Sequence, residues 1–256
     1  MKSSGKDMSV HHIVVLTKRP YEAVTELSKH FDIVEKQGEI CIAIGGDGTF
    51  LEATRKLDCP ILLIRGGERN SLGFHADAQL DELPTVIERL KAGDYQVEKH
   101  RKLRVTLDRV SCEAVNDAVL FRANPGVIHF RVSYFDEEGR PESLFPDTVK
   151  GDGVIIASEI GSTGYNYFSS GPVILGGDVA AVTPICANHR YSIVSDKDFE
   201  VELLKNEGSL QCDGVEVGRL GVGDSFTVSR SNRLVRIIRL AGMESFSRKL
   251  SRLHGF

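Results

Sequence analysis

Apolar and polar residues alternate along the first ninety residues in a pattern typical of strands and helices in turn. Three short runs are continuously apolar, and amphipathic stretches separate them. The apolar runs span residues 13–16, 40–44 and 61–64, and the predicted helices span residues 21–30, 50–57 and 80–91. Continuous apolar runs are typical of parallel strands that helices cover on both faces. The pattern therefore predicts an α/β domain with a parallel sheet.

The pattern changes after residue 94. Short segments of alternating character follow, such as residues 97–107 and 129–135, and glycine-containing turns divide them. Few helical stretches interrupt these segments, so residues 95–240 predict a mostly antiparallel, all-β domain. Residues 244–253 then form an amphipathic segment with helical spacing.

The most specific motif is Gly45-Gly46-Asp47-Gly48-Thr49, which directly follows the apolar run 40–44. Glycines let a backbone turn sharply and bring its N–H groups close to phosphate oxygens. Asp47 is expected at the carboxyl end of a strand, where open α/β sheets bind ligands. A carboxylate beside a phosphate is repulsive unless it holds a metal or accepts a proton. The motif therefore favours phosphoryl transfer over passive binding, although a purely structural turn stays an alternative.

A second glycine-acid block lies in the β-rich part of the chain. Residues 150–158 read Lys-Gly-Asp-Gly-Val-Ile-Ile-Ala-Ser, and residues 161–165 read Gly-Ser-Thr-Gly-Tyr. Together with the first motif, this block resembles the signature of the NAD kinase family. That family belongs to a superfamily with diacylglycerol, sphingosine and 6-phosphofructokinase-type kinases. Val115-Asn116-Asp117 resembles the family's Asn-Glu pair, and Leu72-Gly73-Phe74 its Leu-Gly-Phe turn.

The resemblance runs from about residue 40 to residue 240 and implies a domain organisation. It implies a Rossmann-like α/β domain over residues 1–94 that carries the glycine motif, and an NAD-binding β-rich domain over residues 95–240. Residues 241–256 are expected to pack back on the first domain. The implied activity is transfer of the γ-phosphate of ATP, or of polyphosphate, to the adenosine 2′-hydroxyl of NAD.

The resemblance also suggests roles for individual residues. Asp47 is the candidate general base that takes the proton of the 2′-hydroxyl, with metal holding or turn shaping as alternatives. Mg²⁺ is expected to bind mainly through phosphate oxygens and waters, so no dedicated metal ligands are assigned. The candidate residues for binding NAD and ATP are Gly45, Gly46, Gly48, Thr49, Phe74, Asn116, Asp117, Lys150, Asp152, Thr163 and Tyr165.

Several of these candidates have a plain structural alternative. Phe74 is equally well an ordinary core residue, and Lys150 a solvated surface charge. Asn116 and Asp117 would face opposite ways in a strand, so one of them would be structural. The chain also departs from the family pattern, with Glu159-Ile160 at the usual Thr-Pro, Gly164 at the usual Ala, and Phe168 at a frequent Ser.

Two other functions stay open at this point. A lipid kinase of the same superfamily would need an apolar acyl pocket and a membrane-facing surface, and the sequence contains no basic amphipathic membrane helix. A dinucleotide sensor without catalysis is the other alternative; the retained Asp47 argues against it, and Glu159-Ile160 keeps it open.

Composition narrows the partners and the compartment. The 256 residues carry a formal net charge of -4, which argues against a nucleic-acid partner. No apolar stretch approaches the ~18 residues that span a bilayer, and the polar N-terminus lacks a signal peptide's apolar core. The five cysteines are widely spaced, so we expect reduced thiols and a cytoplasmic protein. The family resemblance implies a homodimer or homotetramer.

Overall fold

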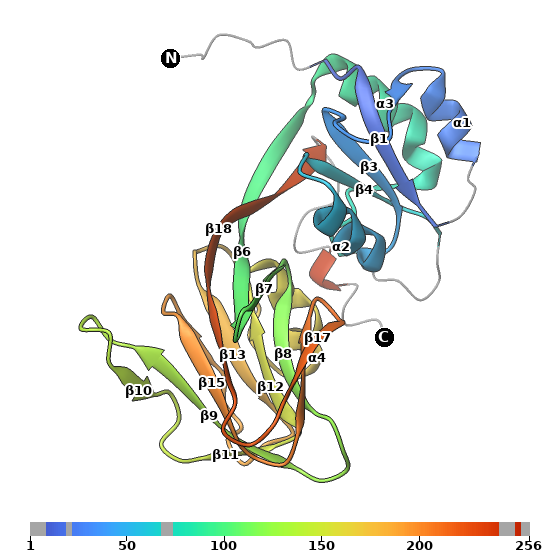
Figure 1. The fold of residues 1–256 in the computed structure, drawn as a ribbon. Coiled ribbons are helices and arrows are strands. Elements are labelled where there is room, and N and C mark those ends of the chain that lie inside the picture. Colours follow the sequence, from blue (N-terminus) through green and yellow to red (C-terminus); the bar gives the residue numbers. More distant parts are fainter. Residues whose placement is uncertain (1–8, 19–21, 68–73, 241–248, 252–256) are drawn as a thin grey trace. The chain divides into compact units, whose positions relative to one another are not determined.

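The chain folds into two compact units in a computed structural model that describes residues 9–18, 22–67, 74–240 and 249–251. One unit comprises residues 1–99 and 235–256, and the other comprises residues 100–234. Two long strands carry the chain from one unit into the other, β6 (Tyr95–Leu107) and β18 (Ser225–Leu240) (Figure 1).

The first unit is built on a parallel sheet, as the apolar runs predict. Its strands pair in the order β2-β1-β3-β4, and all of these pairs are parallel. The strands are β1 (His12–Thr17), β2 (Asp32–Ile33), β3 (Ile40–Gly45) and β4 (Ile61–Arg65), and a short β5 (Ala78–Gln79) pairs with β4. Every residue of β3 is buried, which is the position of a strand covered on both faces.

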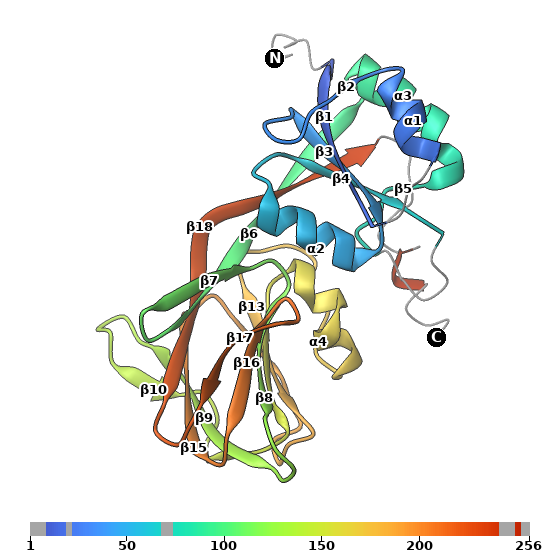
Figure 2. The same ribbon diagram turned by 45° about the vertical axis from the view of Figure 1, so that its right-hand side comes forward.

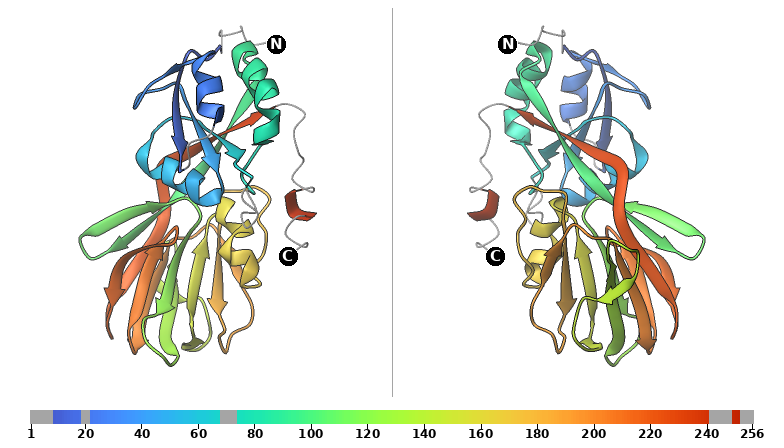
Figure 3. Two further views of the ribbon diagram at one scale, coloured as in Figure 1. Left: turned by 90° about the vertical axis from the view of Figure 1, so that its right-hand side faces the viewer. Right: turned by 90° about the vertical axis from the view of Figure 1, so that its left-hand side faces the viewer.

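Helices pack against the sheet of this unit. The helices α1 (Glu22–Ser28) and α3 (Leu83–Ala92) lie side by side, and they share a core cluster with one set of alternating strand residues (Figure 3). The helix α2 (Asp47–Lys56) is absent from that cluster, and its Phe50 and Ala53 are fully buried. No helix among the described residues combines the length and apolar character needed to cross a membrane.

Two predicted helices begin elsewhere than expected. The segment predicted over 80–91 divides into a 3₁₀ turn, η1 (Leu80–Glu82), and α3, because Pro84 has no N–H to continue an α-helix from Leu80. The helix predicted over 50–57 starts earlier, at Asp47. Gly46 caps it, and its carbonyl accepts bonds from Thr49 N at 2.9 Å and Phe50 N at 3.2 Å. Part of the glycine motif is therefore helical.

The second unit is mostly antiparallel, as predicted, and contains two sheets. One has the order β14-β13-β12-β8-β16-β17, and in the other the order β10-β9-β15-β18 is joined by β11, which pairs with β9. The first sheet comprises β8 (Asp117–Arg122), β12 (Gly153–Ala157), β13 (Ala180–Ile185), β14 (Ile193–Ser195), β16 (Gly208–Cys212) and β17 (Val215–Leu220). The second contains β7 (Val110–Ala114), β9 (Ile128–Phe135), β10 (Pro141–Ser143), β11 (Val149–Gly151) and β15 (Phe199–Lys205).

The core of the second unit joins the two sheets. Leu120 and Val154 from one sheet belong to the same buried cluster as Phe130, Val201 and Phe226 from the other. Two short helices, η2 (Ile160–Thr163) and α4 (Tyr165–Phe168), follow β12, and α4 lies outside this core (Figure 2). The second glycine-acid block therefore spans the end of β11, the strand β12 and the two helical turns that follow.

Candidate active site

The glycine motif ends β3 and opens α2, and two of its glycines have different steric surroundings. A Cβ at Gly45 would lie 2.3 Å from Oγ1 of Thr49, so this position has no room for a side chain. A Cβ at Gly48 would meet nothing within 4 Å. Gly46 offers no side chain to cap the first N–H groups of α2. The start of this helix is therefore suited to bind an anion such as a phosphate.

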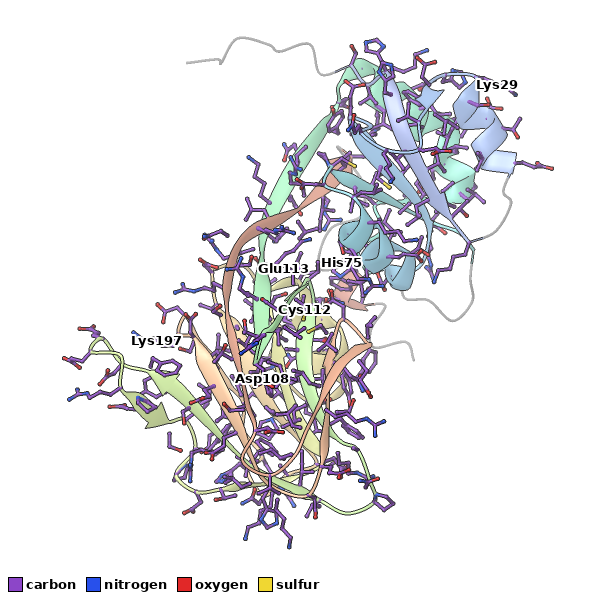
Figure 4. The ribbon with its side chains drawn as sticks, in the orientation of Figure 1. Lys29, His75, Asp108, Cys112, Glu113 and Lys197 are labelled. Carbon is purple, nitrogen blue, oxygen red and sulfur yellow. The ribbon has the colours of Figure 1, made fainter. Side chains whose placement is uncertain are left out.

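Asp47 lies in the first turn of α2, and its carboxylate accepts two backbone hydrogen bonds. Oδ2 accepts from Phe74 N and Oδ1 from His75 N, each at 3.2 Å. The ring of His75, which Figure 4 labels, packs against Phe50 of α2, with ring centroids 5.1 Å apart. The carboxylate is thus held in place while each oxygen retains capacity to accept a further bond. Phe74 is buried, and Leu72-Gly73 of the predicted turn lie outside the described residues.

Asn116 and Asp117 lie at the start of β8, where one carboxylate organises their backbone. Asp213 accepts hydrogen bonds from the backbone N–H groups of Val115, Asn116 and Asp117, at 2.9, 2.7 and 3.3 Å. Asp213 itself has a left-handed φ of 49°, in the turn after β16. We call this contact the Asp213 clamp.

The carboxyl group of Asp117 is buried in the second unit. Burial raises the pKa of Asp117 to about 7, and the negative charge of Asp213 adds to the effect. Near neutral pH the group therefore exists in both its protonated and its ionised form, so it can either donate or accept a hydrogen bond.

The Gly-Ser-Thr block packs directly on Asn116. A Cβ at Gly161 would lie 1.9 Å from the backbone oxygen of Asn116, and that same oxygen accepts a bond from Ser158 N at 2.8 Å. Oδ1 of Asn116 is buried and has no hydrogen-bond partner among the described residues. This orphaned acceptor marks the place where a ligand donor would be satisfied.

The remaining candidates of the second unit differ in how far they are available. Asp152 pairs with Arg122, with Oδ1 2.8 Å from Nε. Tyr165 is 43% exposed, and its phenol has a raised pKa from burial, with smaller contributions from Cys186, Asp117 and Asp152. The phenol of Tyr165 is therefore near enough to the carboxylates of Asp117 and Asp152 for their charges to affect its pKa.

Thr163 and Lys150 are the least direct candidates for ligand contact. The Thr163 hydroxyl is buried and donates to the backbone oxygen of Ile160 at 3.2 Å, within η2. Lys150 is exposed and lies opposite His129 in the pairing of β11 with β9. The structure therefore gives the Thr163 hydroxyl a role inside its own turn.

Comparison with known proteins identifies the family. Residues 116–240 match a family model described as the ATP-NAD kinase C-terminal domain. The chain is 31% identical to the NAD kinase of Clostridium perfringens over 259 residues, which cover 93% of this chain and 90% of that protein. This chain belongs to the NAD kinase family. It is also 33% identical to the NAD kinase of Leifsonia xyli, over 86% of this chain and 74% of that protein.

Solved structures of NAD kinases share the fold. Yeast NADH kinase complexed with NADH superposes with a TM-score of 0.81 at 18% identity, over 97% of this chain and 88% of that chain. An NAD kinase from Archaeoglobus fulgidus in complex with ATP gives a TM-score of 0.75 at 19% identity, over 96% and 99%. The predicted fold class, a parallel α/β part followed by an antiparallel β part, is thereby confirmed.

One departure from the NAD kinase pattern has a structural explanation. Glu159 stands where the family usually has Thr, and its Oε2 lies 3.1 Å from Nδ1 of His100. Both side chains belong to the second unit and both are mostly buried. The carboxylate of Glu159 is therefore engaged by His100 within its own unit.

Asp213 and Asn166 have structural roles that sequence reasoning did not assign. Asn166 is fully buried; its Nδ2 donates to Pro172 O at 2.8 Å and its Oδ1 accepts from Thr183 Oγ1 at 2.7 Å. It thereby holds the helix of Tyr165 against β13. The Cys-Asp-Gly order at residues 212–214 was a signal for Asp213, but its partners lie about 97 residues away in sequence.

Proposed function

We propose that this protein is an NAD kinase that transfers the γ-phosphate of ATP to the adenosine 2′-hydroxyl of NAD, giving NADP. The observation that carries the proposal is the position of Asp47, held by two backbone N–H groups in the first turn of a helix that lacks a side-chain cap, in a member of the NAD kinase family. The relatives named above are NAD and NADH kinases.

The glycine motif is the proposed phosphate-binding element. Gly48 is exposed and leaves the backbone of the helix start accessible at that position, and the N–H groups and helix dipole there favour a negatively charged group. Gly45 serves differently, because its missing side chain allows Thr49 to pack against the end of β3.

Asp47 is the proposed general base. Its carboxylate accepts the proton of the 2′-hydroxyl as that oxygen attacks the γ-phosphorus, and the bond from the γ-phosphorus to the β-bridging oxygen breaks to release ADP. The two N–H groups that hold the carboxylate orient it without consuming all of its acceptor capacity.

The proposed NAD-binding residues lie in the second unit. The unpartnered Oδ1 of Asn116 suits a donor such as an adenine amino group or a ribose hydroxyl. Asp117, Asp152 and Tyr165 add carboxylates and an aromatic face to the same proposed role, and Thr163 contributes through the shape of η2.

Mg²⁺ fits this proposal as a partner of the triphosphate. The described residues hold no group of three or more His, Cys, Asp or Glu side chains arranged for a metal. The donors would therefore be chiefly phosphate oxygens and waters, with Asp47 as the nearest protein carboxylate in the motif. When bound, the ion neutralises charge that develops on the phosphates.

One experiment tests the function against its alternatives. The purified protein is incubated with Mg²⁺ and either ATP or polyphosphate, with NAD, NADH or diacylglycerol as acceptor, and the products are identified by mass. We expect NADP or NADPH with the dinucleotide acceptors. A phosphorylated lipid would point to the lipid kinase. If the folded protein binds NAD but no donor yields a phosphorylated product, the protein is a dinucleotide sensor and not a kinase.

A further inference from the structure

Two thiols of the second unit lie close together although 100 residues separate them. Sγ of Cys112 on β7 is 2.7 Å from Sγ of Cys212 at the end of β16. Cys112 is partly exposed and Cys212 is buried, and both are free thiols in this structure. Figure 4 shows Cys112 with its neighbour Glu113 on β7, beyond the turn at Asp108.

This separation is close to that of a disulfide. A disulfide has an S–S distance of about 2.05 Å, so the two sulfurs need to approach by only about 0.6 Å from their present distance. No other pair of thiols lies within hydrogen-bond distance in the part of the chain that the structure describes. The strands that carry Cys112 and Cys212 thus hold them ready to be linked.

The environment distinguishes the two thiols chemically. The hydrogen bond between them lowers the pKa of Cys112 and raises the pKa of Cys212, while burial and, to a smaller extent, the charges of Asp213 and Glu113 oppose the lowering. Cys112 is also the partly exposed thiol and Cys212 the buried one, so a peroxide can reach Cys112 as the nucleophile, and Cys212 is the partner that resolves the intermediate. By contrast, burial raises the pKa of both Cys41 and Cys59.

We propose that Cys112 and Cys212 form a reversible oxidation site that a hydroperoxide converts into a disulfide. The Cys112 thiolate attacks a peroxide oxygen, the O–O bond breaks, and the departing oxygen takes up the proton that Cys112 lost on ionising, so that a sulfenic acid and an alcohol or water result. The Cys212 sulfur then attacks the sulfenic sulfur, the S–O bond breaks, and the hydroxide leaves as water with the proton of Cys212. A dithiol reductant reverses the reaction by thiol–disulfide exchange.

The site is coupled to the Asp213 clamp by direct chain neighbours. Asp213 follows Cys212, and its carboxylate holds the N–H groups of Val115, Asn116 and Asp117, which begin three residues after Cys112. Drawing the sulfurs together shifts both ends of the clamp. This step rests on the proposed function, which assigns Asn116 and Asp117 to NAD. Oxidation is expected to weaken NAD binding on the order of threefold to tenfold, the change that corresponds to weakening one hydrogen bond.

The test is carried out on the full chain. The protein is treated with hydrogen peroxide, free thiols are alkylated in denaturant, and non-reduced peptides are mapped by mass. We expect a peptide pair linked through Cys112 and Cys212 that dithiothreitol separates. Cys112→Ser should abolish the linkage, whereas the matched variant Cys59→Ser should retain it.

Two outcomes would overturn the proposal. Free or singly over-oxidised Cys112 and Cys212 in folded, peroxide-treated protein would exclude the oxidation site. A linked pair with the same NAD dissociation constant by calorimetry before and after oxidation would exclude coupling to the clamp. Because peptide mapping needs no activity, a protein that forms the linkage but makes no NADP would refute the proposed function alone.

Discussion

At the scale of single residues, the carboxylates of this protein differ in what holds them. Asp47 is fixed by two N–H groups of residues 74 and 75, Asp213 by three N–H groups of residues 115–117, and Asp152 by Arg122. Asp117 is buried beside another carboxylate and has a raised pKa. Each arrangement leads to a different expected response to removing the charge.

Asp47→Asn tests the proposed base. Asn retains the shape and one acceptor oxygen but cannot take the proton, so kcat should fall on the order of 10²–10⁴-fold. The NAD dissociation constant should change little. Steady-state kinetics and calorimetry measure the two quantities, and urea unfolding controls for loss of the backbone bonds to Phe74 and His75.

Different results would assign Asp47 another role. A defect that high Mg²⁺ partly restores would indicate metal holding. Near-normal turnover would mean that the carboxylate only shapes the start of α2.

Asp117→Asn tests the buried carboxyl group through the pH dependence of stability. A pKa of about 7 in the folded state against 3.8 for the ordinary group means that the folded protein binds the extra proton between these values. Stability from this group is therefore present at low pH and is lost as pH rises toward 7. The Asn variant lacks this loss, so it should gain stability relative to the parent by up to about 1.4 kcal/mol per pH unit over this range.

The measurement is urea unfolding of both proteins from pH 5 to pH 8. Only the difference between variant and parent matters, because other groups that titrate in this range, such as His129 with its lowered pKa, add slopes of opposite sign to both proteins. A difference that does not vary with pH would show that Asp117 ionises normally in the folded protein.

At the scale of elements, the helical turns after β12 position the proposed NAD-binding residues. Ser158 N donates a hydrogen bond to the backbone oxygen of Asn116, and Gly161 packs against that same oxygen. Asn166 links α4 to β13 by accepting a hydrogen bond from Thr183. None of these contacts involves a predicted ligand-binding side chain directly. The geometry of the proposed NAD-binding residues therefore depends on how closely these backbones approach.

Gly161→Ala and Gly164→Ala form a matched pair for this approach. A Cβ at position 161 would lie 1.9 Å from a backbone oxygen, whereas at position 164 the nearest atom is 3.3 Å away. We expect Gly161→Ala to lower the free energy of unfolding by about 1–3 kcal/mol, as overpacking does, and to raise KM for NAD. Gly164→Ala, which introduces the family's usual residue, should change both much less.

Thermal or urea unfolding and initial rates at varied NAD check this pair. Equal effects of the two substitutions would show that contact between Gly161 and Asn116 does not set the position of the binding segment.

At the scale of the whole molecule, we expect a homodimer or homotetramer. In the family, the turns near Asp152 and Tyr165 meet a neighbouring subunit, and closed symmetry is usual for such assemblies. In this chain Tyr165 is 43% exposed and Phe168 is 58% exposed, which leaves aromatic surface beside the proposed NAD-binding residues. Sedimentation should give two or four times the chain mass; a fully active monomer at assay concentrations would contradict this expectation.

The sequence by itself determined the class of fold and the approximate positions of the strands and helices in the first unit. Continuous apolar runs at β1, β3 and β4 and alternating segments after residue 94 record burial on two faces or on one, which is a local property of each strand. The glycine motif and the second glycine-acid block likewise carried the family resemblance. The roles of the site residues remain predictions, because a motif names residue types and not their partners.

Only the tertiary structure decided which distant segments meet. It brought Asp213 within hydrogen-bond distance of the N–H groups of residues 115–117, Cys212 next to Cys112, and His100 next to Glu159. The sequence pattern indicated widely spaced thiols and an unexplained Glu, because neither spacing nor composition encodes the pairing of strands far apart in the chain. Strand pairing depends on the packing of the whole unit. The pairing brings these carboxylates, thiols and the imidazole together, and their proximity produces the hydrogen bonds and the pKa shifts described above.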